Sequence, residues 1–264
     1  CASSGLSPLR GMATQFHEKL SPRMENHHVV ITSSGQLEDG RSFQFNVNHV
    51  GDQININYSE GYRLEKGAEA DKKLIEEAAQ TAANADAAIL VVGGFHGYSD
   101  AWDDNAYDAE SLDKPDMFLP FGQDELIAEV LQANSNTIIV LIGGGPVDMT
   151  KWEEKAKGII QAWYPGMEGG NALARIILGE TNPSGKLPMT FPKKLQDNSA
   201  HAIGEYPGEN LTITYNEGIF VGYRYHDKYN IDPLFPFGHG LSYTSFEYSN
   251  LEVAKNGNTV DLKV

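Results

Sequence analysis

The sequence contains a single cysteine, Cys1, among its 264 residues. One thiol cannot form a disulfide within the chain, and it cannot build a zinc site from cysteine ligands. Long apolar runs are also missing, because no stretch approaches the roughly 20 residues that cross a bilayer as a helix. These absences argue against a disulfide-stapled fold, against a cysteine-based metal site and against a membrane partner.

Basic residues are scarce. The chain has 20 Lys and Arg against 36 Asp and Glu, which gives a formal net charge of −16. Binding to a phosphate backbone depends on a stripe of basic side chains that releases counterions, and the sequence offers no such stripe. We therefore exclude nucleic acid as a partner, and the charge fits a soluble protein that handles neutral or cationic small molecules.

Several signature motifs are absent as well. No G-x-S-x-G sequence is present, which disfavours a serine hydrolase of the common α/β type. Glycines at 93–94 and 143–145 follow apolar runs, but they form no G-x-G-x-x-G and no P-loop lysine follows them. We interpret them as tight turns at the carboxyl edge of a sheet, where a ligand crevice is a general expectation. The histidines are scattered, and we expect neither a metal nor a cofactor.

The middle of the chain alternates between two periodicities. EADKKLIEEAAQTAANA (69–85), GQDELIAEVLQAN (122–134) and NALARIILG (171–179) have helical spacing, the last with a stop at Gly179. AAILVVGG (87–94), NTIIVLIGGG (136–145) and GIIQAWYPG (158–166) are continuous apolar runs typical of buried parallel strands. The pattern predicts an α/β fold, with a mostly parallel sheet flanked by helices on both faces (an α/β sandwich).

The two ends of the chain differ from this middle. Residues 27–64 alternate apolar and polar between turn sequences, which predicts a small antiparallel β excursion near the N-terminus. Beyond residue 182 the sequence is rich in loops and aromatic residues, and we expect it to wrap over the first half. We therefore expect one α/β domain over 1–250, in which 26–64 is a β-rich excursion or insertion. Residues 251–264 are expected to be a tail or the start of a following β-sandwich domain.

The stretch from Phe95 to Leu126 is the best chemical candidate. It follows a predicted strand and interleaves carboxylates with exposed aromatic side chains. Rings stack on the apolar faces of sugars, and carboxyl groups bind hydroxyls or protonate a glycosidic oxygen. The alternative is a solvated acidic surface loop, and composition alone leaves both interpretations open. The residues concerned are Asp100, Asp103, Asp104, Asp108, Glu110 and Asp113, with Tyr98, Trp102 and Tyr107 among them.

Five segments together indicate a family. They are AESLDKPDMFLPFGQDELI (109–127), NTIIVLIGGGPVDMTKW (136–152), AWYPGMEGGNALARIILGETNPSGKLPMTFP (162–192), YNEGIFVGYRYHD (215–227) and PLFPFGHGLSYTSFEYS (233–249). In these segments the chain closely resembles the C-terminal α/β sandwich domain of family-three glycoside hydrolases, the β-glucosidase and β-xylosidase family. The resemblance extends from about residue 86 to residue 251.

The resemblance implies roles for individual residues. The family's acid/base is often the Glu of a Glu-Gly-x-Asp-Arg segment, which implies that Glu110 is the acid/base and places Asp113 and Lys114 at the Asp and Arg. Two departures are Ser111 for Gly and Lys114 for Arg. Trp102 and Tyr107 are then expected to form walls of the substrate site together with Asp113 and Lys114. Some members take their acid from an earlier loop position, for which Asp103, Asp104 and Asp108 are weaker candidates.

The family's nucleophile is an aspartate on a preceding TIM-like barrel, which these residues do not include. The resemblance thus implies a C-terminal domain or fragment of a retaining β-glucosidase-like enzyme, with a glycoside as substrate and the barrel as partner. The alternative is a non-catalytic carbohydrate-binding or structural module. Because the chain begins with Cys1 we expect a fragment boundary, with a mature lipoprotein end as the alternative. The opening CASSGLSPLRGM resembles the family's Gly/Ser-rich loop, which implies that the first strand of the sandwich is missing. The location is open, with a secreted or periplasmic site preferred over a cytoplasmic one.

Overall fold

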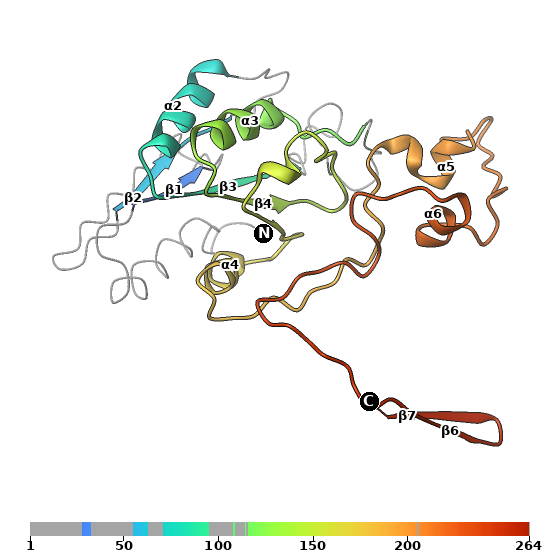
Figure 1. The fold of residues 1–264 in the computed structure, drawn as a ribbon. Coiled ribbons are helices and arrows are strands. Elements are labelled where there is room, and N and C mark those ends of the chain that lie inside the picture. The colour runs from blue at the N-terminus through green and yellow to red at the C-terminus, as the bar shows by residue number, and fades with distance from the viewer. Residues whose placement is uncertain are drawn as a thin grey trace.

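A five-stranded parallel sheet forms the centre of the molecule (Figure 1). The computed structural model describes residues 28–32, 55–62, 71–94, 108, 114, 116–204 and 206–263. The strands follow the order β2-β1-β3-β4-β5, and each neighbouring pair runs parallel. Their bounds are β1 His28–Thr32, β2 Asn55–Ser59, β3 Ala87–Gly93, β4 Thr137–Ile142 and β5 Gly158–Gln161.

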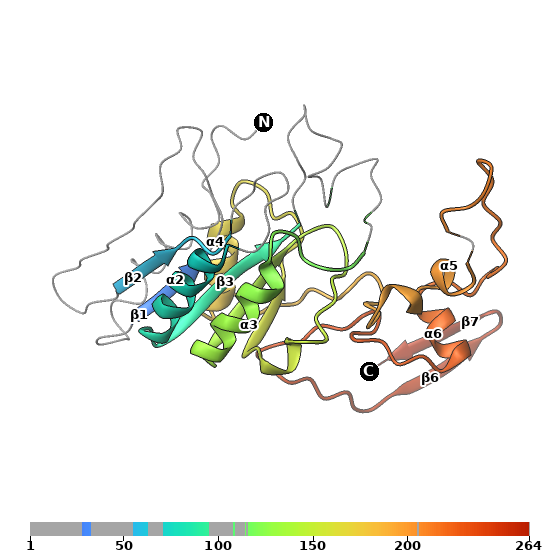
Figure 2. The same cartoon turned by 90° about the horizontal axis from the view of Figure 1, so that it is seen from above.

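Helices cover both faces of this sheet (Figures 1 and 2). Helices α2 (Lys72–Ala83) and α3 (Gln123–Ala133) lie on one face, and α4 (Gly169–Ile177) lies on the other. Strand β3 is apolar without interruption because both of its faces are buried. Leu90 packs into the core beneath α2 and α3, whereas Ile89 packs with Leu173 of α4 on the other face. The predicted sandwich, with its parallel strands and flanking helices, is therefore confirmed.

Local sequence determines where these helices begin and end. The side chain of Asp71 accepts hydrogen bonds from the backbone amides of Lys73 and Leu74, so it caps α2. The predicted stop after α4 is also present, since Gly179 has a φ of 74° in the left-handed region that glycine tolerates. Between β4 and β5 the chain forms a 3₁₀ turn, η1 (Glu153–Lys155).

The prediction of an antiparallel excursion over 27–64 is wrong for the strands that the structure describes. Strand β1 pairs in parallel with β2, with Val30 opposite Asn57, and it also pairs in parallel with β3. Both strands thus belong to the main sheet and extend it by two strands. The alternating sequence between them (33–54) lies outside the described residues.

The C-terminal segment returns to the main core. The backbone of Leu187 donates to His239, and Phe191 pairs with Phe235, so two distant loops run side by side. Phe191 is 1% exposed and joins the core beneath α2 and α3, as the expected wrapping requires. Short elements decorate this segment: η2 (Leu195–Asp197), α5 (Ser199–Ala202) and α6 (Tyr223–Tyr229).

A separate antiparallel hairpin ends the chain. Strands β6 (Glu252–Asn256) and β7 (Thr259–Lys263) pair with each other, and Figure 1 shows them away from the sheet. Every residue of both strands is exposed. The hairpin lies in the tail that we predicted to begin a following domain, and that assignment and the domain bounds stay predictions. Among the described residues, no helix combines the length and the apolar character that crossing a membrane requires.

One buried amide ties helix α3 to the end of β3. Gln123 is fully buried, and its side-chain oxygen accepts from the Gly93 amide at 2.7 Å. Its Nε2 donates to the carbonyls of Gly93 and Pro120, each at 2.9 Å. A glutamine side chain at this position therefore pairs both backbone groups of Gly93 and adds a second donor to the Pro120 carbonyl, which also accepts from the backbone amide of Gln123 at 3.3 Å.

Replacing Gln123 with leucine tests this connection. The variant keeps the volume and removes the side-chain partners of the Gly93 amide and carbonyl, so we expect the free energy of unfolding to fall by about 2–4 kcal/mol. Urea denaturation of the protein measures the change. Gln80→Leu, at an exposed position of α2, is the matched control and should change stability by less than about 0.5 kcal/mol. Equal losses in the two variants would contradict the role of Gln123.

Candidate functional site

The carboxyl ends of β3 and β4 approach each other very closely. The amide of Gly94 donates to the carbonyl of Ile142 at 2.9 Å. Gly93 has a φ of 157°, and a Cβ built on it would lie 1.8 Å from the Ile142 carbonyl oxygen. Only glycine allows two backbones to come this near, so the glycines after the predicted strands serve the packing of the sheet edge.

The same glycines leave room for the side chain of Asp108. A Cβ on Gly94 would lie 2.7 Å from the Cβ of Asp108, and a Cβ on Gly143 would lie 3.3 Å from its Oδ2. Asp108 therefore occupies a recess formed by the ends of two neighbouring strands. Its side chain is only 7% exposed, which makes it a nearly buried carboxylate.

Three donors from three parts of the chain surround this carboxylate. The ammonium of Lys114 lies 2.8 Å from Oδ1. The backbone amide of Gly144, after β4, and the hydroxyl of Tyr164, after β5, both donate to Oδ2. An ionised carboxylate only accepts hydrogen bonds, so it matches a recess in which every partner donates.

These partners determine the charge state of Asp108. Burial by itself would raise the pKa of the carboxyl group, but the hydrogen bonds from Lys114, Tyr164 and Gly144 outweigh it and hold the pKa below its usual range. The pKa of the Tyr164 hydroxyl is raised in turn, first by burial and then by its bond to the neighbouring anion. Asp108 is thus a fixed anion, and Tyr164 is a neutral donor.

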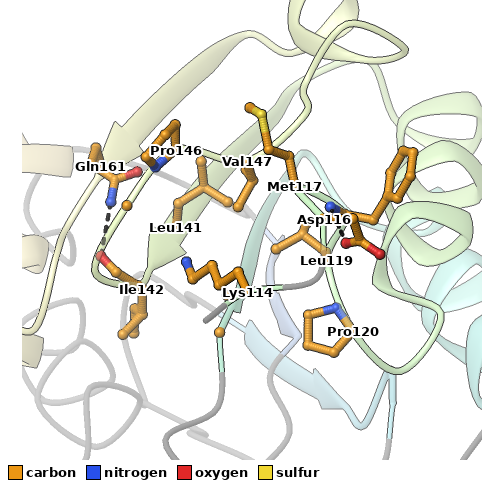
Figure 3. Close-up of a pocket in the computed structure, with 15 residues that line it drawn as sticks. Lys114, Asp116, Met117, Leu119, Pro120, Leu141, Ile142, Pro146, Val147 and Gln161 are labelled. Atoms are coloured by element: carbon orange, nitrogen blue, oxygen red, sulfur yellow. Dashed lines mark hydrogen bonds between the residues drawn. The ribbon is translucent and has the colours of Figure 1, made fainter. Parts of the chain in front are cut away.

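A small pocket opens beside Lys114 at this edge of the sheet (Figure 3). Figure 3 shows Lys114 between Ile142 of β4 and the Leu119–Pro120 turn. Most of the wall is apolar. Its polar groups come from the glycine backbones, from Lys114 and Asp116, and from Gln161, whose Nε2 donates to the Gly143 carbonyl at 3.1 Å. The expected crevice at the glycine-rich edge is therefore present.

The structure describes two of the acidic-loop candidates. Asp108 and Lys114 lie together as an ion pair, and Lys114 also lines the pocket. The other predicted site residues lie outside the described residues; they are Glu110, Trp102, Tyr107, Asp113, Asp103 and Asp104. Tyr164 and Gly144 were not predicted to take part. Position alone indicates them, since each lies near the end of a predicted strand segment (136–145 and 158–166) and therefore near the same sheet edge.

The described part of the chain assembles no group of three or more His, Cys, Asp or Glu side chains that could hold a metal ion. The arrangement at the sheet edge is instead an anion held by donors. It offers fixed charge and fixed geometry, and its carboxylate oxygens are already engaged.

The lowered pKa of Asp108 makes stability depend on pH. A carboxyl group whose folded-state pKa lies below its unfolded value stabilises the fold above about pH 4, and this contribution is lost as pH falls through the folded-state pKa. We expect wild type to be more stable than Asp108→Asn near neutral pH, and the difference to shrink below about pH 4. Urea unfolding at a series of pH values measures it.

The control for this experiment is Glu77→Gln, which opens an exposed ion pair between Lys73 and Glu77 at 3.6 Å on α2. Exposed pairs contribute little, so this variant should follow wild type at every pH. A stability difference between wild type and Asp108→Asn that stays constant from neutral to acid pH would contradict the assignment of Asp108 as a buried anion.

Comparison with known proteins identifies the family. The sequence model described as "Glycosyl hydrolase family 3 C-terminal domain" matches residues 2–243. Thermostable β-glucosidase B of Acetivibrio thermocellus is 46% identical over 205 residues, which cover 78% of this chain and 25% of that protein. A β-glucosidase of Rhizobium radiobacter is 46% identical over 197 residues, which cover 72% of this chain and 23% of the relative. The chain thus spans about a quarter of the length of these relatives.

Solved structures agree. The β-glucosidase of Bifidobacterium adolescentis superposes with a TM-score of 0.73 at 30% identity, over 96% of this chain and 38% of that one. A β-glucosidase of Kluyveromyces marxianus, solved with glucose, gives a TM-score of 0.61 at 41% identity, over 70% of this chain and 21% of that one. With the parallel sheet, its two helical layers and the matched segments, the chain belongs to glycosyl hydrolase family 3, as a C-terminal domain of that family.

Proposed function

We propose that the chain is part of a retaining β-glucosidase to which it supplies the general acid/base, Glu110. The observation that carries the proposal is the fixed position of the residues on either side of Glu110 in the sequence. Asp108 and Lys114 are held together at the carboxyl edge of the sheet, beside a pocket. This edge is where open α/β sheets place their ligands, and the relatives are named β-glucosidases.

In this mechanism Glu110 acts twice. It first donates its proton to the glycosidic oxygen, so that the bond from the anomeric carbon to the leaving alcohol breaks while an aspartate carboxylate forms a bond to that carbon. The resulting Glu110 carboxylate then takes a proton from water, whose oxygen attacks the anomeric carbon and releases the aspartate. The nucleophile would lie on the barrel domain, at the separation of about 5–5.5 Å that retaining enzymes use.

Asp108 is a poor candidate for the acid, although it was one of the alternatives. A proton donor must be protonated at the working pH, which requires a raised pKa. The pKa of Asp108 is lowered, and both carboxylate oxygens already accept hydrogen bonds. These properties suit a fixed anion and not an acid, so Glu110 is favoured over its neighbour.

The remaining roles concern the substrate. Lys114 lines the pocket while its ammonium contacts Asp108. An ammonium has three N–H donors, so Lys114 would also donate to a sugar hydroxyl. Asp113 would accept from a hydroxyl, and Trp102 and Tyr107 would stack on the sugar. Because the chain spans about a quarter of its relatives, the sugar and the linkage depend on the surface of the barrel.

Glu110→Ala in the full-length protein that carries this chain tests the assignment. General acid catalysis contributes about 10²–10⁴-fold, so kcat/KM on phenyl β-glucoside should fall by about that factor. The loss on 2,4-dinitrophenyl β-glucoside should be much smaller, because that leaving group departs without a proton. Azide should restore kcat on the dinitrophenyl substrate by attacking the glycosyl-enzyme directly, since an anionic nucleophile needs no base.

The control is Glu129→Ala, at an exposed position of α3, which should keep wild-type rates on both substrates. If Glu110→Ala lost kcat/KM equally on the phenyl and dinitrophenyl substrates and azide did not restore kcat, the acid/base assignment would be wrong. Calorimetry of the chain alone with glucose addresses the second hypothesis, a binding module. Binding by the chain, together with unchanged turnover in full-length Glu110→Ala, would favour that module.

A further inference from the structure

We propose that Asp108 is a positioning residue that fixes the segment bearing Glu110 to the edge of the sheet. The proposal rests on the proposed function, because it concerns the geometry of that acid/base. The mechanism above assigns Asp108 no bond that forms or breaks and no proton transfer. Its role would be to hold both ends of residues 108–114 in place through the side chains of Asp108 and Lys114.

The first step of the argument is the ion pair itself. Asp108 and Lys114 are six residues apart, and a fully extended chain of that length would separate their Cα atoms by about 20 Å. The Lys114 ammonium nevertheless lies 2.8 Å from the Asp108 carboxylate. The five intervening residues, which include Glu110, therefore start and finish at neighbouring points of the structure.

The second step is that the pair is attached to the scaffold. Asp108 also accepts from the Gly144 amide, which follows β4, and from the Tyr164 hydroxyl, which follows β5. Rigid strands position functional groups better than loops do, and these two donors come directly after strands of the sheet. The carboxylate of Asp108, with Lys114 bound to it, is thus joined to the residues that follow β4 and β5.

The third step is that the recess is specific for an aspartate carboxylate. Gly94 and Gly143 leave just enough space for it, since a Cβ on either would lie within 3.3 Å of Asp108. All of its partners donate, so asparagine fits the space but turns one N–H group toward a donor and loses the charge that Lys114 requires. A nearly isosteric substitution should therefore loosen the segment without emptying the recess.

The fourth step separates positioning from simple support of the fold. A displaced acid/base fails most where protonation of the leaving group matters most, whereas general destabilisation lowers the rates on all substrates alike. The dependence of kcat/KM on leaving-group acidity is therefore a readout that a merely structural role would not change. The thermal midpoint reports the structural part independently.

The experiment uses the full-length protein and the variants Asp108→Asn, Lys114→Met and Tyr164→Phe. A displacement of about 1 Å can cost about 10²-fold, so Asp108→Asn should lose about 30- to 100-fold in kcat/KM on phenyl β-glucoside. On the dinitrophenyl substrate it should lose less than about 5-fold. Lys114→Met should show the same graded loss because it opens the same ion pair, and Tyr164→Phe, which removes one donor of three, should show a weaker one.

Matched controls come from exposed positions. Glu77→Gln opens another carboxylate–lysine pair, and Tyr248→Phe removes a hydroxyl from a tyrosine that is 83% exposed. Both should retain wild-type kinetics. Lys114→Arg keeps a cation that can reach Asp108, and it should restore most of the rate that Lys114→Met loses on the phenyl substrate.

Two results would overturn the proposal while leaving the function intact. One is a wild-type leaving-group dependence in Asp108→Asn and Tyr164→Phe; the other is a uniform loss on both substrates. In either case the graded loss and azide rescue of Glu110→Ala would persist. If Glu110→Ala itself lacks them, the proposed function fails, whatever Asp108 does. If Asp108→Asn does not fold, Tyr164→Phe decides by the same criterion.

Discussion

The buried carboxylate of Asp108 is the interaction on which the carboxyl edge of the sheet depends. Removing a charge from water is costly unless hydrogen bonds and an opposite charge replace the lost solvation. Here an ammonium, a backbone amide and a phenol replace it, and each comes from a different part of the chain. The glycines after β3 and β4 provide the space. This edge is therefore complete only when the neighbouring strands have paired and the loop has docked.

The buried side chain of Gln123 is a second polar group that fixes the backbone, and it does so beside the pocket. Gln123 binds both backbone groups of Gly93 and the carbonyl of Pro120, so the first residue of α3 is joined to the end of β3. The Leu119–Pro120 turn forms one wall of the pocket and Ile142 forms part of another. Because the amide of Gly94 donates to Ile142, the walls share one hydrogen-bonded framework. The shape of the pocket thus follows from backbone groups that are satisfied in only one arrangement.

The sequence predicts the parts of this fold that arise from local periodicity. The spacing of apolar residues correctly predicts three helices and the strands between them, because an element buried on one face or on both has a matching pattern of apolar residues. The helices span 72–83, 123–133 and 169–177. The pattern does not show which strands pair, or in which direction. Strands β1 and β2 alternate as a hairpin would, yet their neighbours in the sheet are parallel and include β3. The mistaken antiparallel excursion reflects this limit. The sequence also indicates that the acidic stretch is a candidate site. It does not show that Asp108 is the buried carboxylate, because its partners Gly144 and Tyr164 are 36 and 56 residues away along the chain.

If a two-carboxyl site is divided between domains, as we propose, positioning becomes the decisive property of this domain. Under the proposed mechanism, the acid/base and the nucleophile must stand about 5 Å apart across a domain boundary. Any freedom in the segment that carries Glu110 would broaden that separation, and the rate of a step with fixed geometry falls steeply with such displacement. A loop alone would not supply the required precision, because connections between elements are their most mobile parts. Under this proposal, anchoring both ends of the segment through Asp108 would transfer the rigidity of β4 and β5 to the acid. The anchoring carboxylate could not serve as the acid itself, since a carboxylate that must stay ionised is unsuited to donate a proton. Asp108 and Glu110 are two residues apart, and under this proposal they take opposite roles. Asp108 is a permanent anion and Glu110 is the acid, because their environments favour different protonation states.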